Sequence, residues 1–130
     1  MKPIRLIVAG CRDFKNSEKI FTILTLILEK VNKEDLEIVS GGCEGADSIA
    51  IDFAKSFNIS YKIFEADWKT FGKAAGPIRN EKMAKYGTHL IAFWDSKSKG
   101  TKNMILNAKQ CKLHIKIISN CIGERNPLNL

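Results

Sequence analysis

Short apolar runs alternate with amphipathic stretches along the whole length of this chain. Five runs have the length and composition of strands, at residues 4–9, 36–39, 59–64, 90–94 and 115–118. After the first run, apolar residues recur with the three- and four-residue spacing of one helix face: Ile20, Ile23, Leu24, Ile27, Leu28 and Val31. Asn16 and Ser17 precede this stripe and are suited to cap a helix.

Three further helices are predicted by similar signals. Residues 46–57 repeat the apolar stripe with small alanines, which favours close packing on a sheet. Residues 77–86 begin with a proline, which suits a first helical turn, and residues 100–111 begin with a Gly-Thr step. The segment 65–77 carries two aromatic residues and is predicted to be the longest irregular segment.

Five strands alternating with four helices predict a parallel sheet covered on both faces. Right-handed crossovers then make the fold class α/β, a Rossmann-like doubly wound sandwich. We expect the strand order 3-2-1-4-5. The third strand alternates apolar and polar residues, which is typical of a partly exposed edge.

The composition fits one globular domain, since the chain has 130 residues of which 45% are hydrophobic. We assign residues 1–119 to this domain and residues 120–130 to a loose C-terminal tail. Arg5 interrupts the first apolar run, and the apolar runs are far shorter than the roughly 20 residues of a membrane span. We therefore expect a cytoplasmic protein that does not bind membranes.

The formal net charge of +7 permits nucleic acid or a phosphorylated ligand as partner, but the scattered lysines favour the simpler account of a solvated, lysine-rich surface. The chain has four cysteines without metal-ligand spacing: Cys11, Cys43, Cys111 and Cys121. We expect reduced thiols and no metal site. His89 and His114 fall beside or within predicted strands, so a cysteine nucleophile activated by histidine is not expected.

Glycine-rich segments follow the predicted strands, at the edge where parallel sheets bind ligands. Gly41, Gly42 and Gly45 precede one helix, and Gly100 with Thr101 opens another. Glycine admits backbone close to a ligand, and a helix N-terminus offers unpaired N–H groups, so these segments are candidates to hold a phosphate. Neither matches G-x-G-x-x-G or the P-loop pattern, which argues against ordinary dehydrogenases and P-loop NTPases.

Charged and aromatic residues occur in the same segments. Arg12 and Arg79 lie in presumed loops and suit bidentate contacts to phosphate, or simply surface ion pairs. Trp68 and Phe71 either stack on a base or plug the open end of the sheet. Asp47 either contacts a ribose hydroxyl or favours the dipole of its helix. Further carboxylates on this edge, with acid–base potential, are Asp13, Glu44 and Asp95.

Joined in order, these segments resemble one known family. Residues 10–14, Gly-Cys-Arg-Asp-Phe, resemble its G-[SC]-R-x-[FW] opening, and residues 39–47 resemble its second motif. Residues 66–80 resemble its long third motif, D-W-x-x-[YF]-G-K-x-A-G-x-x-R-N, and residues 93–101 resemble its last. The family is the YspA-like, cpYpsA-related branch of the SLOG superfamily, and the resemblance extends over residues 4–119.

The resemblance implies a Rossmann-like fold that binds nucleotides or nucleotide-derived ligands. Relatives include LOG phosphoribohydrolases, the single-stranded DNA-binding protein DprA, and sensor domains for NAD-derived signals. LOG enzymes carry P-G-G-x-G-T-x-x-E, and here Met104 stands in place of that glutamate. Hydrolysis of the LOG type would therefore need Asp47 or Glu44 as a substitute, and whether the chain is an enzyme stays open.

The first hypothesis is a nucleotide-binding sensor or processing module, with a nucleotide as ligand and no certain cofactor. The expected ligand-binding residues are Gly10, Arg12, Gly41, Gly42, Gly45, Asp47, Trp68, Gly76, Arg79, Asn80, Gly100 and Thr101. The alternatives are a hydrolase or transferase acting on a nucleotide's glycosidic or phosphate linkage and, ranked last, a binder of single-stranded DNA. Related proteins often self-associate, so a homo-oligomer is compatible with the resemblance.

Overall fold

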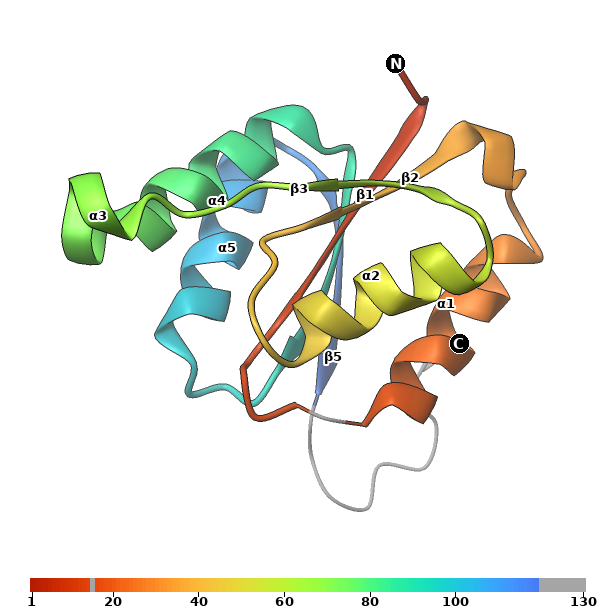
Figure 1. The fold of residues 1–130 in the computed structure, drawn as a ribbon, viewed down its shortest axis with the longest axis horizontal. Coiled ribbons are helices and arrows are strands. Elements are labelled where there is room, and N and C mark those ends of the chain that lie inside the picture. The colour runs from red at the N-terminus through yellow and green to blue at the C-terminus, as the bar shows by residue number, and fades with distance from the viewer. Residues whose placement is uncertain (15, 120–130) are drawn as a thin grey trace.

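The computed structural model describes residues 1–14 and 16–119 and contains a five-stranded, all-parallel sheet (Figure 1). The strand order is β3-β2-β1-β4-β5, so the predicted fold class and strand order are both confirmed. The strands are β1 (Ile4–Gly10), β2 (Leu36–Ser40), β3 (Ser60–Ile63), β4 (His89–Trp94) and β5 (His114–Ser119).

Helices cover both faces of the sheet (Figure 1). The α-helices are α1 (Ser17–Leu28), α2 (Ala46–Ser56), α3 (Trp68–Phe71), α4 (Ala75–Tyr86) and α5 (Lys99–Gln110). Two 3-10 turns, η1 (Lys33–Asp35) and η2 (Gly72–Ala74), complete the described elements. The buried residues of α1 and α2 pack on one face of the sheet, and those of α4 and α5 pack on the other.

Strand β1 lies at the centre of both cores. Leu6 and Val8 belong to the core under α1 and α2, whereas Ile7 and Ala9 belong to the core under α4 and α5. Successive side chains of a strand point to opposite faces, so a strand buried on both faces needs a continuous apolar run. This requirement explains why residues 4–9 lack the alternation of a half-exposed strand.

Polar side chains cap the N-termini of α1 and α5. Asn16 caps α1 as predicted, since its Oδ1 accepts a hydrogen bond from the Lys19 N–H at 3.0 Å. Ser98 caps α5 in the same way, with its Oγ accepting from the Thr101 N–H at 3.3 Å. Each cap satisfies a backbone N–H that a helix start otherwise leaves without a partner.

The prediction that residues 65–77 are irregular was wrong. Asp67 caps the short α3 by accepting from the Thr70 N–H at 3.1 Å, η2 follows, and α4 begins two residues before Pro77. Pro77 is tolerated there because the first four N–H groups of a helix need no intrahelical acceptor. The described chain therefore has five α-helices where the sequence pattern predicted four.

Strand β3 is exposed along its whole length, which confirms the predicted edge. No helix within residues 1–14 and 16–119 is long and apolar enough to cross a membrane. The predicted tail, residues 120–130, lies outside the described residues.

Candidate nucleotide site

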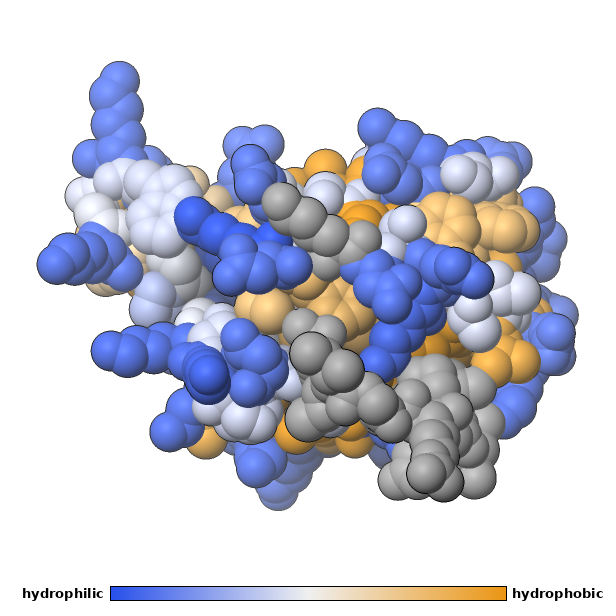
Figure 2. Space-filling model, turned by 90° about the horizontal axis from the view of Figure 1, so that it is seen from below, coloured by the Kyte–Doolittle hydropathy of each residue, from blue (hydrophilic) through white to orange (hydrophobic). Residues whose placement is uncertain are grey.

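Two adjoining cavities open where β1, β2 and β4 end, the side seen in Figure 2. Hydrophilic side chains are spread over this side, and several extend outward at the end where α3 lies (Figures 1 and 2). The central cavity, of about 320 Å³, lies between the end of β1, α4 and the start of α5. The side cavity, of about 570 Å³, lies between the β2–α2 loop and the end of β3. Four residues line both cavities: Arg12, Cys43, Trp68 and Arg79.

The structure brings together most of the predicted site residues. The central cavity is lined by Gly10, Arg12, Asp47, Trp68, Gly76, Arg79, Asn80, Gly100 and Thr101. Gly41, Gly42 and Glu44 line the side cavity. Gly45 lines neither cavity, and of the further carboxylates Asp13 and Asp95 also lie outside both. Phe71 likewise lines neither, although Trp68 in the same helix lines both.

Arg79 lies in α4 rather than in a loop, and its guanidinium is held in place by hydrogen bonds. Its Nη1 donates to the Gly41 carbonyl oxygen at 2.9 Å, and its Nε donates to Asn80 Oδ1 at 3.0 Å. Its Nη2 group contacts the Cys43 sulfur at 3.9 Å. The bonds to oxygen use Nη1 and Nε, whereas Nη2 contacts only the Cys43 sulfur, so a pre-oriented donor group is left for a ligand.

Arg12 is held differently, at the exposed end of β1. The turn that carries it is closed by a hydrogen bond from the Phe14 N–H to the Cys11 carbonyl oxygen at 3.1 Å, and Phe14 is buried in the core. The Arg12 side chain itself has no hydrogen-bond or ion-pair partner among the described residues. The turn from Cys11 to Phe14 therefore places Arg12 where it lines both cavities. The guanidinium of Arg12 is available to a ligand.

Asp47 is buried in the first turn of α2, with 6% of its surface exposed. Its Oδ2 accepts a hydrogen bond from the Cys43 N–H at 3.4 Å, and the Ser40 hydroxyl donates to its carbonyl oxygen at 3.0 Å. Burial raises the pKa of the Asp47 carboxyl to about 6, and the nearby charge of Arg79 acts in the opposite direction. The carboxylate thus supports the β2–α2 loop beside two arginines and titrates near neutral pH.

This raised pKa predicts that the Asp47 carboxyl makes stability fall as pH rises. Between the unfolded value of 3.8 and the folded value of about 6, the folded state binds more protons than the unfolded state. By pH 7 the free energy of unfolding has therefore lost about 3 kcal/mol through this carboxyl, at 1.36 kcal/mol for each unit of pKa. We expect Asp47→Asn to gain stability relative to the unmodified chain over this range, as measured by urea unfolding at pH 4, 5, 6 and 7. A constant difference between the two proteins would contradict the prediction.

Asn80 connects α4 to the start of α5. Its Nδ2 donates to the Gly100 carbonyl oxygen at 3.3 Å and to Asn103 Oδ1 at 3.0 Å. The Thr101 hydroxyl lies 3.1 Å from the Ser98 hydroxyl, so Thr101 belongs to the cap of α5. A Cβ atom at Gly100 would meet nothing within 4 Å, so packing does not require glycine there.

Trp68 is half exposed, at 50%, and Phe71 is 46% exposed, so neither side chain is buried as a plug in the end of the sheet. A Cβ atom at Gly76 would lie 3.4 Å from Trp68 Cη2, which places the indole against the first turn of α4. Trp68 therefore lies at both cavities, with about half of its surface accessible to solvent.

Cys11, Cys43 and Cys111 are free cysteines among the described residues, and Cys121 lies outside them. Burial, followed by the negative charge of Asp95, raises the pKa of Cys11, which disfavours its thiolate. His89 and His114 stack with ring centroids 4.8 Å apart at the amino ends of β4 and β5, the opposite edge from the cavities.

Three contacts within the site were not predicted from the sequence. Ser98 caps α5, and its spacing of three residues before Thr101 is a signal that could have revealed it. Asn103, one turn after Gly100, faces Asn80. Cys43 contacts Arg79 across 36 positions of sequence, and no local pattern predicts that contact.

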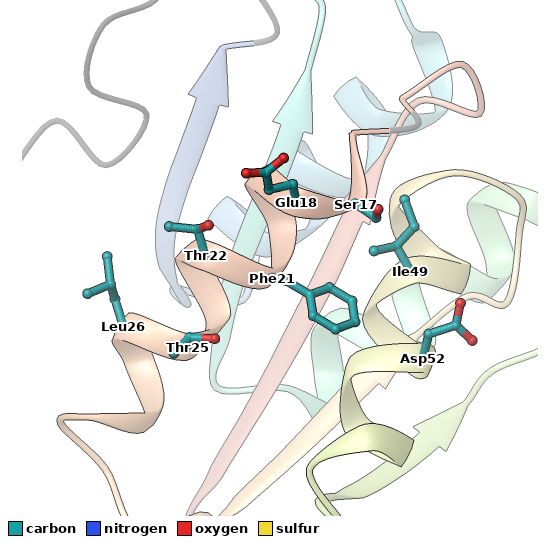
Figure 3. A pocket seen from close by; sticks show the side chains of 8 residues that line it. All are labelled: Ser17, Glu18, Phe21, Thr22, Thr25, Leu26, Ile49 and Asp52. Carbon is teal, nitrogen blue, oxygen red and sulfur yellow. The ribbon is translucent and has the colours of Figure 1, made fainter.

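A third hollow, of about 630 Å³, lies between α1 and α2, away from the glycine-rich loops (Figure 3). Its two carboxylates, Glu18 and Asp52, point in different directions, and Phe21 points towards α2. Because its polar groups do not converge, we do not consider it a ligand site.

No group of three or more His, Cys, Asp or Glu side chains able to hold a metal ion occurs in the part of the chain described.

The described residues form a Rossmann-like α/β protein with two adjoining cavities at the carboxyl edge of the sheet. The model of the YspA, cpYpsA-related SLOG family matches residues 4–71. Gene 61 protein of Mycobacterium phage D29 is 30% identical over 117 residues, which cover 85% of this chain and 93% of that protein. The chain belongs to the YspA, cpYpsA-related SLOG family.

Two solved structures of DNA processing protein A (DprA) have a similar fold. The protein from Streptococcus pneumoniae matches with a TM-score of 0.75 and 16% identity, over 93% of this chain and 52% of that chain. The Helicobacter pylori protein, described for its single-stranded DNA binding mode, matches with a TM-score of 0.72 and 18% identity, over 98% of this chain and 71% of that chain. At these identities the likeness establishes the fold. This chain spans about half of the pneumococcal protein's length.

Proposed function

We propose that this protein binds the phosphate of a nucleotide or nucleotide-derived ligand in the central cavity, as a sensor or processing module. The observation that carries the proposal is the meeting of Arg12, Arg79 and the first turn of α5 at one cavity. Two guanidinium groups supply charge-assisted donors, and a helix N-terminus supplies unpaired N–H groups and a positive dipole.

Pre-orientation strengthens this proposal. The guanidinium of Arg79 is already held by Gly41 and Asn80, so binding a phosphate costs it little conformational entropy. Asp47 partly offsets the positive charge of Arg79 when the site is empty, and its raised pKa allows it to become neutral beside an anion. We therefore expect phosphate binding to strengthen as pH falls towards 6.

Thermal shift with a nucleotide panel tests the proposal directly. The panel contains AMP, GMP, NAD, ADP-ribose and cyclic nucleotides, and a ligand at 100 times its Kd adds about 2.7 kcal/mol, or several degrees in Tm. Arg12→Ala is the matched variant, because Arg12 is exposed and has no side-chain partner among the described residues. We expect its unliganded Tm to be unchanged and its ligand shift to be reduced. An undiminished shift would remove Arg12 from the site.

Gly100 provides a test of the α5 N-terminus. Nothing lies within 4 Å of a Cβ atom there, so Gly100→Ala is expected to raise stability by a few tenths to about 1 kcal/mol. The added methyl group would nevertheless stand at the cavity and hold a phosphate away from the backbone N–H groups. We expect a higher unliganded Tm together with a smaller ligand shift. An unchanged ligand shift would argue against phosphate contact at α5.

Binding of single-stranded DNA is the second candidate. The similar fold of the Helicobacter pylori DprA, the net charge of +7 and the two exposed aromatic side chains of α3 support it. It predicts that the affinity for a short oligodeoxynucleotide falls steeply and log-linearly with salt concentration. Fluorescence anisotropy over a salt series distinguishes it from binding of one mononucleotide, which would show a shallow dependence.

Acid–base chemistry on the bound nucleotide is a further candidate, supported by Asp47. This carboxyl lines the central cavity with a pKa of about 6, near the value that general acid–base catalysis requires. Met104, at the position of the LOG glutamate, is buried at the same cavity and has no ionisable group. If a nucleotide is turned over, Asp47→Asn is expected to abolish the reaction while binding persists.

A further inference from the structure

The two adjoining cavities differ in charge. Lys99 and the buried carboxyl of Asp47 line the central cavity in addition to the shared arginines, so positive groups outnumber negative ones there. Two carboxylates, Glu44 and Glu65, face the same two arginines in the side cavity. A ligand that occupies both cavities passes between Arg12, Arg79 and Trp68, which line both. Such a ligand needs an anionic end and an end rich in hydrogen-bond donors.

The pairing of strands β2 and β3 explains why Glu44 and Glu65 line the same cavity. Strands β2 and β3 are parallel neighbours with Ser40 opposite Ile63, and the Phe64 N–H donates to the Ser40 carbonyl oxygen at 2.8 Å. The segments that follow these strands therefore leave the sheet side by side. Glu44 and Glu65 are exposed, and neither carboxylate has a hydrogen-bond or ion-pair partner among residues 1–14 and 16–119.

We infer that the ligand is a ribonucleotide whose phosphate lies in the central cavity and whose 2′- and 3′-hydroxyl groups donate to Glu44 and Glu65 in the side cavity. This inference rests on the proposed function. A carboxylate accepts well from a sugar diol, and a 2′-hydroxyl is the group that distinguishes ribose from deoxyribose. Trp68, half exposed between the cavities, offers an aromatic face to the base.

The same charges disfavour a ligand with phosphates on both sides of the sugar. In the side cavity two carboxylates offset the charge of the two arginines, so a second phosphate there would meet repulsion from Glu44 and Glu65 as well as attraction. A continuous DNA strand carries such a phosphate and lacks the 2′-hydroxyl. The charge pattern therefore favours a single ribonucleotide over an oligodeoxynucleotide at this site.

Calorimetric titration of the full chain with AMP, 2′-deoxy-AMP, 2′,3′-dideoxy-AMP and ribose 5-phosphate tests the inference. We expect the dideoxy compound to bind roughly tenfold or more weakly than AMP, since it lacks both hydrogen bonds to charged groups. The preference is expected to disappear in a Glu44→Gln, Glu65→Gln double variant. Glu29→Gln, at an exposed glutamate that lines neither cavity, is the matched control and should keep it.

Three outcomes overturn the inference, and they separate it from the proposed function. If all four compounds bind equally and binding depends on Arg79, the sugar assignment fails and the phosphate site stands. If the preference for ribose persists in the double variant, the hydroxyl groups are recognised elsewhere. If none of the four compounds binds, or if Arg12→Ala and Arg79→Ala leave binding unchanged, the phosphate site fails and the ribose assignment fails with it.

Discussion

Arg79→Ala is expected to weaken binding of a nucleotide phosphate by about 10- to 100-fold, the scale of 1.5–3 kcal/mol for a hydrogen bond to a charged group. The guanidinium is the most firmly oriented cation at the central cavity, with bonds of 2.9 Å to Gly41 and 3.0 Å to Asn80. Isothermal titration with the nucleotide found in the thermal-shift panel measures the change. Unchanged affinity would remove Arg79 from the site.

The unliganded protein should also become less stable in this variant. Without Arg79 the Gly41 carbonyl oxygen loses its hydrogen-bond donor, and the buried Asp47 loses a neighbouring positive charge. The pKa of Asp47 is then expected to rise further. Arg79→Lys separates the two effects because lysine keeps the charge but lacks the planar fork of donors. If phosphate binding needs the planar guanidinium donors, the lysine variant will still bind the nucleotide weakly although its stability recovers.

Gly45→Ala is expected to destabilise the fold by about 2–4 kcal/mol, a large effect for a single methyl group. Gly45 has φ +85° and ψ −134°, a conformation that residues with a Cβ atom rarely adopt. A Cβ atom there would lie 2.6 Å from the Cys11 carbonyl oxygen and 2.8 Å from the Arg12 carbonyl oxygen. Both neighbours are backbone atoms, so a side-chain rotation cannot relieve the overlap.

Urea unfolding of Gly45→Ala beside Gly100→Ala provides the matched comparison. Each variant adds one methyl group to a glycine of the predicted phosphate segments, but the methyl group at Gly100 meets nothing within 4 Å. We expect a large loss of stability at Gly45 and none at Gly100. Equal stability of the two variants would mean that the β2–α2 loop does not pack against the β1–α1 turn as described.

The strands and the longer helices were predictable because their signals are local and long. The α1 stripe from Ile20 onward repeats over more than two turns, and a run such as residues 4–9 is apolar on both faces because helices cover both. The four-residue α3 was missed because it is too short to show a helical period. Its capping residue, Asp67, is equally common in loops and so gives no distinct helix signal. The start of α4 before Pro77 was missed for a related reason, since proline is compatible with several positions of a first turn.

The sequence predicted most of the residues of the candidate site, but not the distances and contacts between them. Glycines and arginines after parallel strands identify the edge of the sheet, and most of them do line the two cavities. The glycines nevertheless play different parts that sequence does not distinguish. Gly45 is required by the backbone of the neighbouring turn, whereas Gly100 has open space around it.

The sequence by itself determined the α/β class and the edge of the sheet at which the candidate site residues gather, because hydrophobic periodicity and turn residues act between near neighbours in the chain. The strand order was an expectation from that fold class, which the structure confirmed. Only the tertiary structure decided that Arg79 bonds to Gly41, 38 positions away, and that Glu44 and Glu65 line one cavity together. It also decided that Asp47 is buried enough to raise its pKa to about 6. These features depend on distances between segments and on the exclusion of water, and both arise when the sheet and its helices pack.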